Sequence, residues 1–374
     1  MLIFSLLAGL SGVDLSQSTN YHKSYSVTDE GMNQPTHQQK PPETVWRPLT
    51  NLPKEAETWI FPGHNELVSE WKQLNQQLKD DHADNTLLDI WYKERQREFA
   101  IHTGQIEGLY TLKPGVTAHL ITEGFKNVVS AHTLEGIKTA TLKGLLQDQE
   151  SALEMVFNDI KDNKPLDHDV VFNWHRHITR HQETLHGIIP HQGKLHRIEI
   201  PFELKGTYKK DPNSLVRGNN IIFEFCPPER TYEEMSRLFD LYADIRTKNL
   251  PAHVEAAWLH HRFVRTHPFQ DGNGRVSRLL MSYVYLRKGE PSPIISTEGK
   301  PNYIQALRQA DRGNLKVFSD HIGILASGQL QSIIQTSKDA LEKHSRYYHC
   351  NGGVTDNGTY SPPDKEKTED ELEL

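Results

Sequence analysis

Twelve consecutive residues in the second half of the chain carry side chains suited to phosphate chemistry. The run 267–278 reads His-Pro-Phe-Gln-Asp-Gly-Asn-Gly-Arg-Val-Ser-Arg. Gly272 and Gly274 can adopt positive φ angles and expose backbone N–H groups to an anion. Arg275 and Arg278 are forked donors that suit phosphate oxygens. This stretch therefore predicts an anion-binding turn.

Two further side chains of the same run could take part in a reaction. His267 can accept a proton, because a histidine with an ordinary pKa of about 6.5 is largely neutral at pH 7. Asp271 supplies carboxylate oxygens, which suit Mg²⁺. The apolar positions of 276–287 predict a helix whose N-terminus directs positive potential to the same place. A glycine turn before a helix can be a plain connection, but the length and order of this motif argue against that reading.

The ordered pattern resembles the signature of the Fic (Fido-domain) family, His-x-Phe-x-Asp/Glu-Gly-Asn-Gly-Arg-x-x-Arg, at every fixed position. The resemblance implies a protein adenylyltransferase, which moves AMP from ATP to a Ser, Thr or Tyr hydroxyl of a target protein and releases diphosphate. It implies that His267 is the general base, that Asp271 holds Mg²⁺ and that Arg278 meets the γ-phosphate. The residues so predicted to bind ATP and its phosphates are Asp271, Gly272, Asn273, Gly274, Arg275 and Arg278.

A second motif lies upstream, at the end of a predicted helix. In Thr103-Gly-Gln-Ile-Glu107-Gly108, the threonine and the glutamate share one helix face, and Gly108 is a natural helix stop. The motif resembles the Ser/Thr-x-x-x-Glu-Gly/Asn inhibitory motif of Fic proteins, which implies that Glu107 enters the ATP site and pairs with Arg278. Residues 26–31 fit the same short pattern without helical periodicity, and we interpret that match as chance. The alternative for Glu107 is an ordinary helix end that faces solvent.

The residues between the two motifs predict a β-hairpin. Residues 195–204 alternate with the period of a strand, and 219–225 could return as the partner strand. The resemblance implies that such a hairpin is a flap that holds the target segment by strand addition. The connection 206–219 is longer than a tight turn. A surface hairpin without substrate contact is the alternative.

A last site residue is predicted downstream of the signature. The segment 300–315 resembles the family helix that contacts adenine and ribose, and Tyr303 is the residue predicted to contact the base. The family often has two adjacent tyrosines here, whereas this chain has Asn302 first. A tyrosine at the start of a helix can equally be a core residue.

The composition fits one large domain or two closely packed ones. The chain has 374 residues, of which 36% are hydrophobic and 24% charged. Its net charge of −7 gives no basic footprint for nucleic acid, and two cysteines argue against a disulfide scaffold. The apolar start, 2–10, lacks a basic flank and is too short to span a bilayer, so we expect a cytoplasmic protein without a membrane segment.

The expected architecture is mainly α: a Fic/Fido helical core, a small β-hairpin flap and a helical N-terminal region. The predicted organisation is a disordered segment at 1–45, the helical region with the inhibitory helix at 46–160, the catalytic domain at 161–325, a C-terminal helix at 326–348 and a disordered acidic tail at 349–374.

The resemblance implies ATP, Mg²⁺ and an unidentified target protein, which can be the chain itself, as partners, and it leaves a homodimer open. Two other functions also stay open. The same site can remove AMP by hydrolysis, or the fold can be a catalytically silent scaffold that binds nucleotide.

Overall fold

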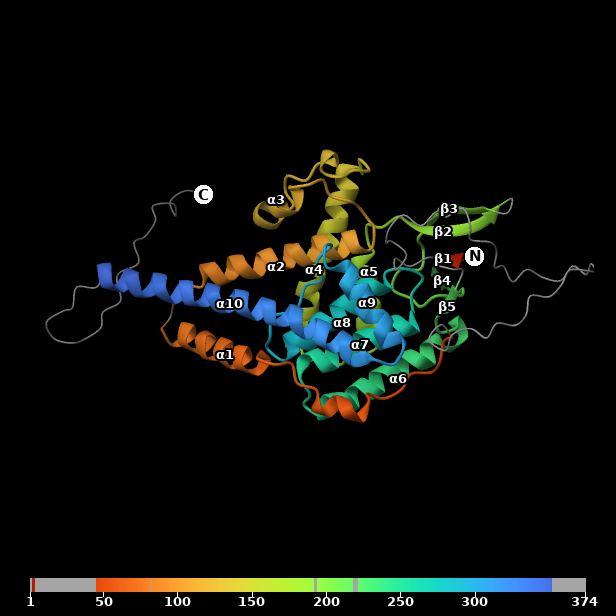
Figure 1. Ribbon diagram of the computed structural model, residues 1–374. Helices are drawn as coiled ribbons and strands as arrows, with labels where there is room; N and C mark the ends of the chain where they lie inside the picture. Colours follow the sequence, from red (N-terminus) through yellow and green to blue (C-terminus); the bar gives the residue numbers. More distant parts are fainter. Residues whose placement is uncertain (1, 4–44, 82, 192–193, 218–220, 352–374) are drawn as a thin grey trace, which may run out of the picture.

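The computed structural model describes residues 2–3, 45–81, 83–191, 194–217 and 221–351 (Figure 1). Most of these residues are helical, which confirms the mainly α prediction. The helices are α1 (His64–Asp80), α2 (Thr86–Ile106), α3 (Val116–Glu123), α4 (Thr139–Lys161), α5 (His168–Ile178), α6 (Pro228–Thr247), α7 (Ala252–Thr266), α8 (Asn273–Arg287), α9 (Lys300–Asp311) and α10 (Leu315–Asn351), with short 3₁₀ turns at Lys54–Thr58 and Ser130–His132. The terminal segments predicted to be disordered lie almost entirely outside the described residues.

Helix α8 lies at the centre of the core. Its apolar side chains are buried on all sides, as Val276, Leu279, Leu280 and Val284 are each at most 1% exposed. Its polar residues Arg275, Ser277 and Arg278 are buried as well, so protein surrounds the helix on every side. Helices α7, α4 and α5 pack around it and, with α2, enclose the start of the helix. The N-terminus of α8, where the signature turn ends, is therefore an internal position.

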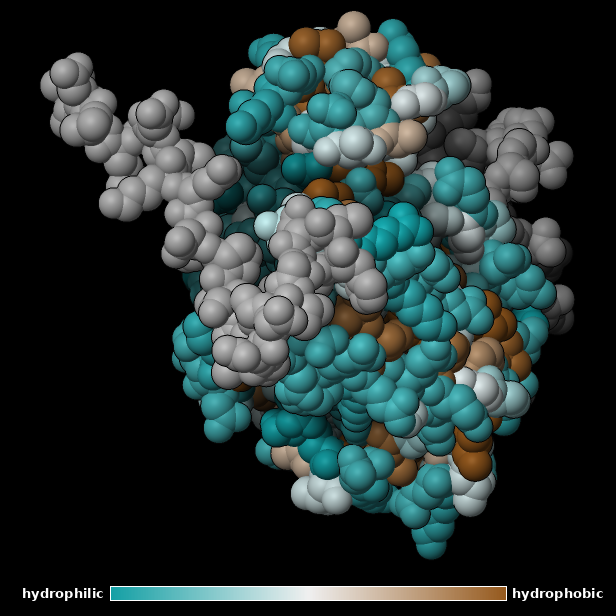
Figure 2. Space-filling model, turned by 90° about the vertical axis from the view of Figure 1, so that its left-hand side faces the viewer, coloured by the Kyte–Doolittle hydropathy of each residue, from teal (hydrophilic) through white to brown (hydrophobic). Residues whose placement is uncertain are grey.

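Helices α1, α2 and α10 run side by side and project from the core (Figure 1). Trp71, Trp91, Leu330 and Ile333 form the inside of this bundle, and the Trp91 indole donates to Ser332 Oγ at 2.8 Å. The face at the projecting end is mainly hydrophilic, with small separate groups of apolar side chains (Figure 2). Burial of the large apolar residues between the helices accounts for that surface.

The last helix is longer than the sequence pattern indicated. Helix α10 has 37 residues and begins at Leu315. The predicted end of the catalytic domain at residue 325 lies inside this one continuous helix, which links the core to the projecting bundle. Within the described residues, no helix combines the length and apolar character that crossing a bilayer requires.

The strand pairing differs from the prediction. Strand β3 (Lys194–Pro201) pairs antiparallel with β2 (Thr184–His191), and β1 (Leu2–Ile3) adds to the far edge of β2. Strand β5 (Ile221–Glu224) pairs antiparallel with β4 (Ser214–Arg217).

The predicted pairing of 195–204 with 219–225 was therefore wrong, although both segments contain strands. Each strand instead pairs with a neighbour only two or three residues away in the chain, and a short connection loses less entropy on closure than a long one. The segment between the hairpins is held by the core, since Phe202 is buried and Lys209 N donates to Pro268 O at 2.8 Å.

Candidate active site

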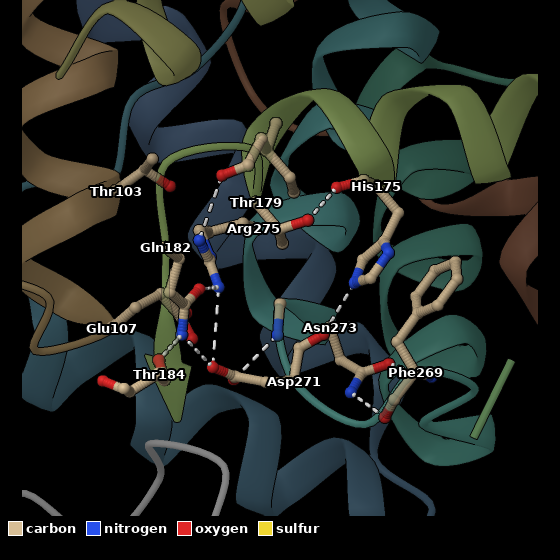
Figure 3. A network of polar contacts seen from close by, with 12 residues as sticks. Thr103, Glu107, His175, Thr179, Gln182, Thr184, Phe269, Asp271, Asn273 and Arg275 are labelled. Carbon is tan, nitrogen blue, oxygen red and sulfur yellow. Dashed lines mark hydrogen bonds and ion pairs between the residues drawn. The ribbon is translucent and has the colours of Figure 1, made fainter. Parts of the chain in front are cut away.

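The signature turn connects the two most buried helices, α7 and α8. His267 ends α7 with a left-handed backbone (φ 50°, ψ 57°), and Gly272 precedes α8 with φ 80°. Asn273 closes the turn, because its Oδ1 accepts from Phe269 N at 2.9 Å and its Nδ2 donates to Phe269 O at 2.8 Å (Figure 3). The predicted anion-binding residue Asn273 is thus fully buried and fixes the shape of the loop.

His267 is held as a neutral ring with one nitrogen available. Its Nδ1 lies 3.3 Å from Val264 O, and since a carbonyl only accepts, Nδ1 carries the proton. Nε2 has no hydrogen-bond partner within the described residues. The ring stacks on Phe225, just after β5, with centroids 3.9 Å apart. Burial, and then the charges of Lys209 and Arg265, lower the pKa of His267 well below its usual value. Nε2 is therefore a proton acceptor at neutral pH.

The carboxylate of Asp271 is held by two different donors. Its Oδ1 accepts from Gly272 N and its Oδ2 accepts from Gln182 Nε2, both at 2.7 Å (Figure 3). The backbone of the same residue is also fixed, because His175 Nε2 donates to Asp271 O at 2.9 Å while His175 Nδ1 accepts from Gly206 N at 2.8 Å. Burial lowers the pKa of His175 to about 3, so this histidine is a neutral bridge between α5, the segment after β3 and the signature turn.

Asp271 fits the role of a magnesium ligand. A carboxylate has about four lone pairs, and each oxygen here accepts one hydrogen bond, which leaves electron pairs for a cation. Within the described residues, no group of three or more His, Cys, Asp and Glu side chains forms a ready-made metal site. Mg²⁺ is often held by one carboxylate together with substrate phosphates and water, and this donor set matches that mode.

Arg275 is fully buried, and its guanidinium donates hydrogen bonds to other residues of the protein. Its Nη1 donates to Ile178 O at 3.1 Å, and its Nη2 donates to Gln182 Oε1 at 2.6 Å. Its Nη2 also lies 3.6 Å from Asp271 Oδ2. The phosphate contact of Arg275 stays a prediction, and these bonds add a structural role that the sequence pattern did not indicate.

The structure brings together the two residues that the sequence predicted to pair. Arg278 Nη2 donates to Glu107 Oε1 at 2.6 Å, and both residues are at most 4% exposed. Arg278 Nε also donates to Thr103 Oγ1, and Gly108 ends the segment with φ 68°. A Cβ atom on Gly274 would collide with Glu107 Oε1, so the carboxylate lies directly against the backbone of the predicted anion hole.

Tyr303 lies in the core. It is 3% exposed, its hydroxyl is 3.0 Å from His260 Nε2, and its ring packs edge-on against His260 and near Phe318. Burial raises the pKa of Tyr303 to about 12. The adenine contact of Tyr303 stays a prediction, while the observed packing is that of a core residue.

Sequence reasoning missed the residues that support the signature turn from a distance. Gln182 and His175 hold Asp271, while Lys209 Nζ donates to Asn213 Oδ1 at 2.6 Å and Asn213 Nδ2 donates to Phe269 O at 2.9 Å. Burial lowers the pKa of Lys209 to about 7. No local pattern marks these residues, because each acts through a turn that lies more than 50 positions away in the chain.

The comparisons with known proteins agree with this geometry. The model of the Fic/DOC family matches residues 165–285. A Fido domain-containing protein of Dictyostelium discoideum is 43% identical over 140 residues, which are 37% of this chain and 94% of that protein. The protein adenylyltransferase fic-1 of Caenorhabditis elegans is 32% identical over 115 residues, which are 31% of this chain and only 23% of the nematode protein.

Two solved structures resemble the overall fold. A Fic domain-containing signalling protein from Bacteroides thetaiotaomicron is 26% identical with a TM-score of 0.59, covering 74% of this chain and 97% of that one. The crystallised Fic-1 of Caenorhabditis elegans has a TM-score of 0.54 over 73% of this chain and 70% of that one. At 21% identity, the second likeness concerns the fold alone.

Proposed function

This chain belongs to the Fic/DOC family, and we propose that it is a protein adenylyltransferase whose activity Glu107 restrains. The observation that carries the proposal is the neutral His267, whose Nε2 has no partner in the described part of the chain and which precedes the turn predicted to bind an anion. Relatives named protein adenylyltransferase support the type of reaction.

In the proposed reaction, a hydroxyl oxygen of the target protein attacks the α-phosphorus of ATP. The new oxygen–phosphorus bond replaces the bond to the bridging oxygen of the β-phosphate, and diphosphate leaves. The hydroxyl proton passes to His267 Nε2, while Nδ1–H keeps its bond to Val264 O. The negative charge of bound ATP would raise the pKa of His267 and so strengthen it as a base.

The remaining residues would bind and orient the phosphates. Asp271 would hold Mg²⁺, which neutralises phosphate charge when it is bound. The backbone N–H groups at the start of α8 and the positive end of that helix favour an anion at Gly272–Gly274. Positioning and charge neutralisation are the main demands of phosphoryl chemistry, so this arrangement suits the reaction.

Glu107 would oppose productive binding in two ways. It occupies Arg278, which would otherwise meet the γ-phosphate, and its carboxylate lies against Gly274, where it repels phosphate oxygens. A nucleotide shifted by even about 1 Å loses on the order of 100-fold in rate. We therefore expect a slow resting enzyme.

The test uses α-labelled ATP with Mg²⁺ and follows label that stays on the protein after denaturation. The chain and its Glu107→Gly variant are compared, and self-modification makes the assay independent of a known target. We expect Glu107→Gly to label on the order of 100-fold faster. Addition of His267→Ala should abolish that labelling. Glu123→Gly is the matched control, because it makes the same change at the exposed end of α3.

Each negative result has a distinct meaning. Equal labelling of the chain and Glu107→Gly removes the inhibitory role. ATP binding without label on any form favours a silent scaffold. Loss of label from a previously modified Glu107→Gly protein, on addition of the unsubstituted chain, identifies the hydrolytic reaction.

A further inference from the structure

We propose that Gln182 is a positioning residue, whose side-chain amide bonds to both Asp271 and Arg275, holds Arg275 out of direct hydrogen-bond contact with Asp271 and so keeps the Asp271 carboxylate open to a divalent cation. Gln182 lies outside the signature, in the bend between α5 and β2. The proposal rests on the role proposed above for Asp271 as the magnesium ligand.

Both the nitrogen and the oxygen of the Gln182 amide are hydrogen-bonded, and these bonds fix the orientation of the amide. Its Nε2 donates to Asp271 Oδ2 at 2.7 Å and to Thr184 O at 3.0 Å, and its Oε1 accepts from Arg275 Nη2 at 2.6 Å (Figure 3). Reversal of the amide would set its N–H groups against the guanidinium and its oxygen against the carboxylate. Since the side chain is buried, those lost bonds would not be replaced by water.

The separation changes what the carboxylate can bind. Asp271 and Arg275 are four residues apart, a spacing that allows a direct ion pair, but Arg275 Nη2 and Asp271 Oδ2 are 3.6 Å apart, which is longer than a hydrogen bond. A direct arginine–carboxylate bond is about 2.7–2.9 Å long and is often bidentate, which would occupy both carboxylate oxygens. With the amide bonded to both side chains, one hydrogen bond reaches each carboxylate oxygen, and Arg275 remains at ion-pair distance without a direct hydrogen bond to Asp271.

The backbone around Gln182 is fixed from the other side by helix α4. Asp148 is fully buried, and its carboxylate accepts from His181 N at 2.8 Å and from Arg180 Nη2 at 2.7 Å. Gln182 N also donates to Thr179 O at 3.1 Å. The amide therefore stands on a rigid support, as a residue that orients a metal ligand must.

The test measures how strongly Mg²⁺ and ATP bind together, in the Glu107→Gly background. Calorimetry gives the Kd of ATP with Mg²⁺ and with EDTA, and the ratio of the two is the magnesium coupling. Gln182→Met keeps a similar length without the amide, so Arg275 can close on Asp271. We expect the coupling to fall about 10- to 100-fold, while the Kd in EDTA stays nearly unchanged.

Two further variants separate positioning from packing. Gln149→Met removes another buried glutamine amide, which donates to Ile178 O at 2.8 Å and has no bond to Asp271, so the coupling should stay unchanged. Gln182→Glu keeps an acceptor for Arg275 and adds a carboxylate beside Asp271. Because two adjacent carboxylates favour a cation, this variant should raise the coupling.

The proposal is overturned if Gln182→Met keeps its coupling, if Gln149→Met loses as much, or if Gln182→Glu falls as Gln182→Met does. Should Gln182→Met not fold, Gln182→Glu is compared with the Glu107→Gly protein itself: a raised coupling supports the positioning role, and a coupling that does not rise overturns it. If Gln182→Met loses the magnesium coupling but no form of the protein is labelled, the positioning role stands and the transfer reaction is refuted. If Glu107→Gly is labelled and Gln182→Met keeps its magnesium coupling, the transfer reaction stands and the positioning role is refuted.

Discussion

The two signature arginines lie one turn apart on α8, and their surroundings differ completely. Both are buried, with 0% and 2% exposure. Arg275 bonds to Ile178 O and Gln182, which belong to the catalytic core. Arg278 bonds to Thr103 of α2 and to Glu107, the C-cap of that helix, which carry the motif proposed to be inhibitory.

The difference shows that burial alone does not make a charged residue structural. The partners of Arg275 belong to the segments that build the signature turn, so they stay in place while that turn exists. The partners of Arg278 belong to the N-terminal region, and in the proposed function they would be exchanged for phosphate oxygens, which can accept from an arginine in a bidentate geometry. We therefore expect Arg275 to stabilise the site and Arg278 to serve the proposed regulation.

The largest expected effect is the loss of stability when Arg275 is replaced. Arg275→Met leaves Asp271 and Gln182 without their buried cation, and breaking such a network lowers the free energy of unfolding by about 3–5 kcal/mol. Urea unfolding measures the loss. The exposed Arg346→Met, which removes an ion pair with the exposed Glu342, is the control and should change stability by less than about 0.5 kcal/mol. A loss below about 1 kcal/mol for Arg275→Met would contradict its structural role.

A smaller effect on stability is expected from the pair of Arg278 and Glu107. Both residues can be removed together, so that neither charge is left buried without its partner. Glu107→Ala and Arg278→Ala, singly and together, form a double-mutant cycle. We expect a coupling free energy of about 2 kcal/mol in urea unfolding, since the pair is buried and hydrogen-bonded. The exposed pair of Arg346 and Glu342 supplies the matched cycle, with a much smaller coupling. Additive effects at Glu107 and Arg278 would show that the contact contributes no stability.

Sequence patterns identified the signature turn and the motif of Thr103 and Glu107, but not the residues that support the turn. The order of His267, Asp271 and Arg278 predicts their chemistry because the residues are local to one turn, and the spacing of Thr103 and Glu107 predicts a shared helix face. The structure brings these two motifs together as expected. The mainly α fold follows from helical periodicity in the same way.

What failed to follow from sequence depends on contacts between distant segments. Strand periodicity marks a strand and carries no information on its partner, which is why 195–204 was matched to the wrong segment. The bonds of Arg275 to Gln182 and of Tyr303 to His260 could not be read from the sequence either, because the partners are distant in the chain. Such long-range contacts leave no local signal.

Both arginines also lie near histidines that burial keeps neutral, and this predicts sensitivity to acid. Burial, and then the charge of Arg275 against the opposing effect of Asp271, lowers the pKa of His175 to about 3 from 6.5. Burial and Arg278 also lower the pKa of His260 well below that value. Above about pH 6.5 the neutral rings contribute their full stability, and below it the unfolded chain binds protons that the folded chain does not.

The free energy of unfolding should therefore fall as the pH drops from about 6.5 toward the folded pKa of His175. One such histidine contributes a slope of about 1.4 kcal/mol per pH unit. Urea unfolding at a series of pH values measures the slope for the chain and for His175→Asn, which keeps a donor for Asp271 O. An unchanged slope in His175→Asn would show that this ring does not remain neutral in the fold.

The smallest expected effect separates the two side-chain contacts that Thr103 and Glu107 make with Arg278. Thr103→Val keeps the size of the side chain and the carbonyl that accepts from Arg278 Nη2 at 3.3 Å, but removes the hydroxyl that accepts from Nε. Loss of one hydrogen bond weakens the inhibited arrangement by about 1 kcal/mol, so basal labelling should rise about fivefold. Labelling with α-labelled ATP measures this increase, which should be far smaller than the increase in Glu107→Gly.

Thr133→Val is the control for Thr103→Val, because it removes another buried threonine hydroxyl, which donates to Ser130 O at 3.1 Å. Labelling unchanged in Thr133→Val and raised in Thr103→Val would place the effect at Arg278. If Thr103→Val labels no faster than the chain itself, the glutamate alone holds Arg278, and the threonine of the inhibitory motif serves the helix. A rise as large as that of Glu107→Gly would instead mean that the two contacts break together, so that α2 leaves Arg278 as one unit.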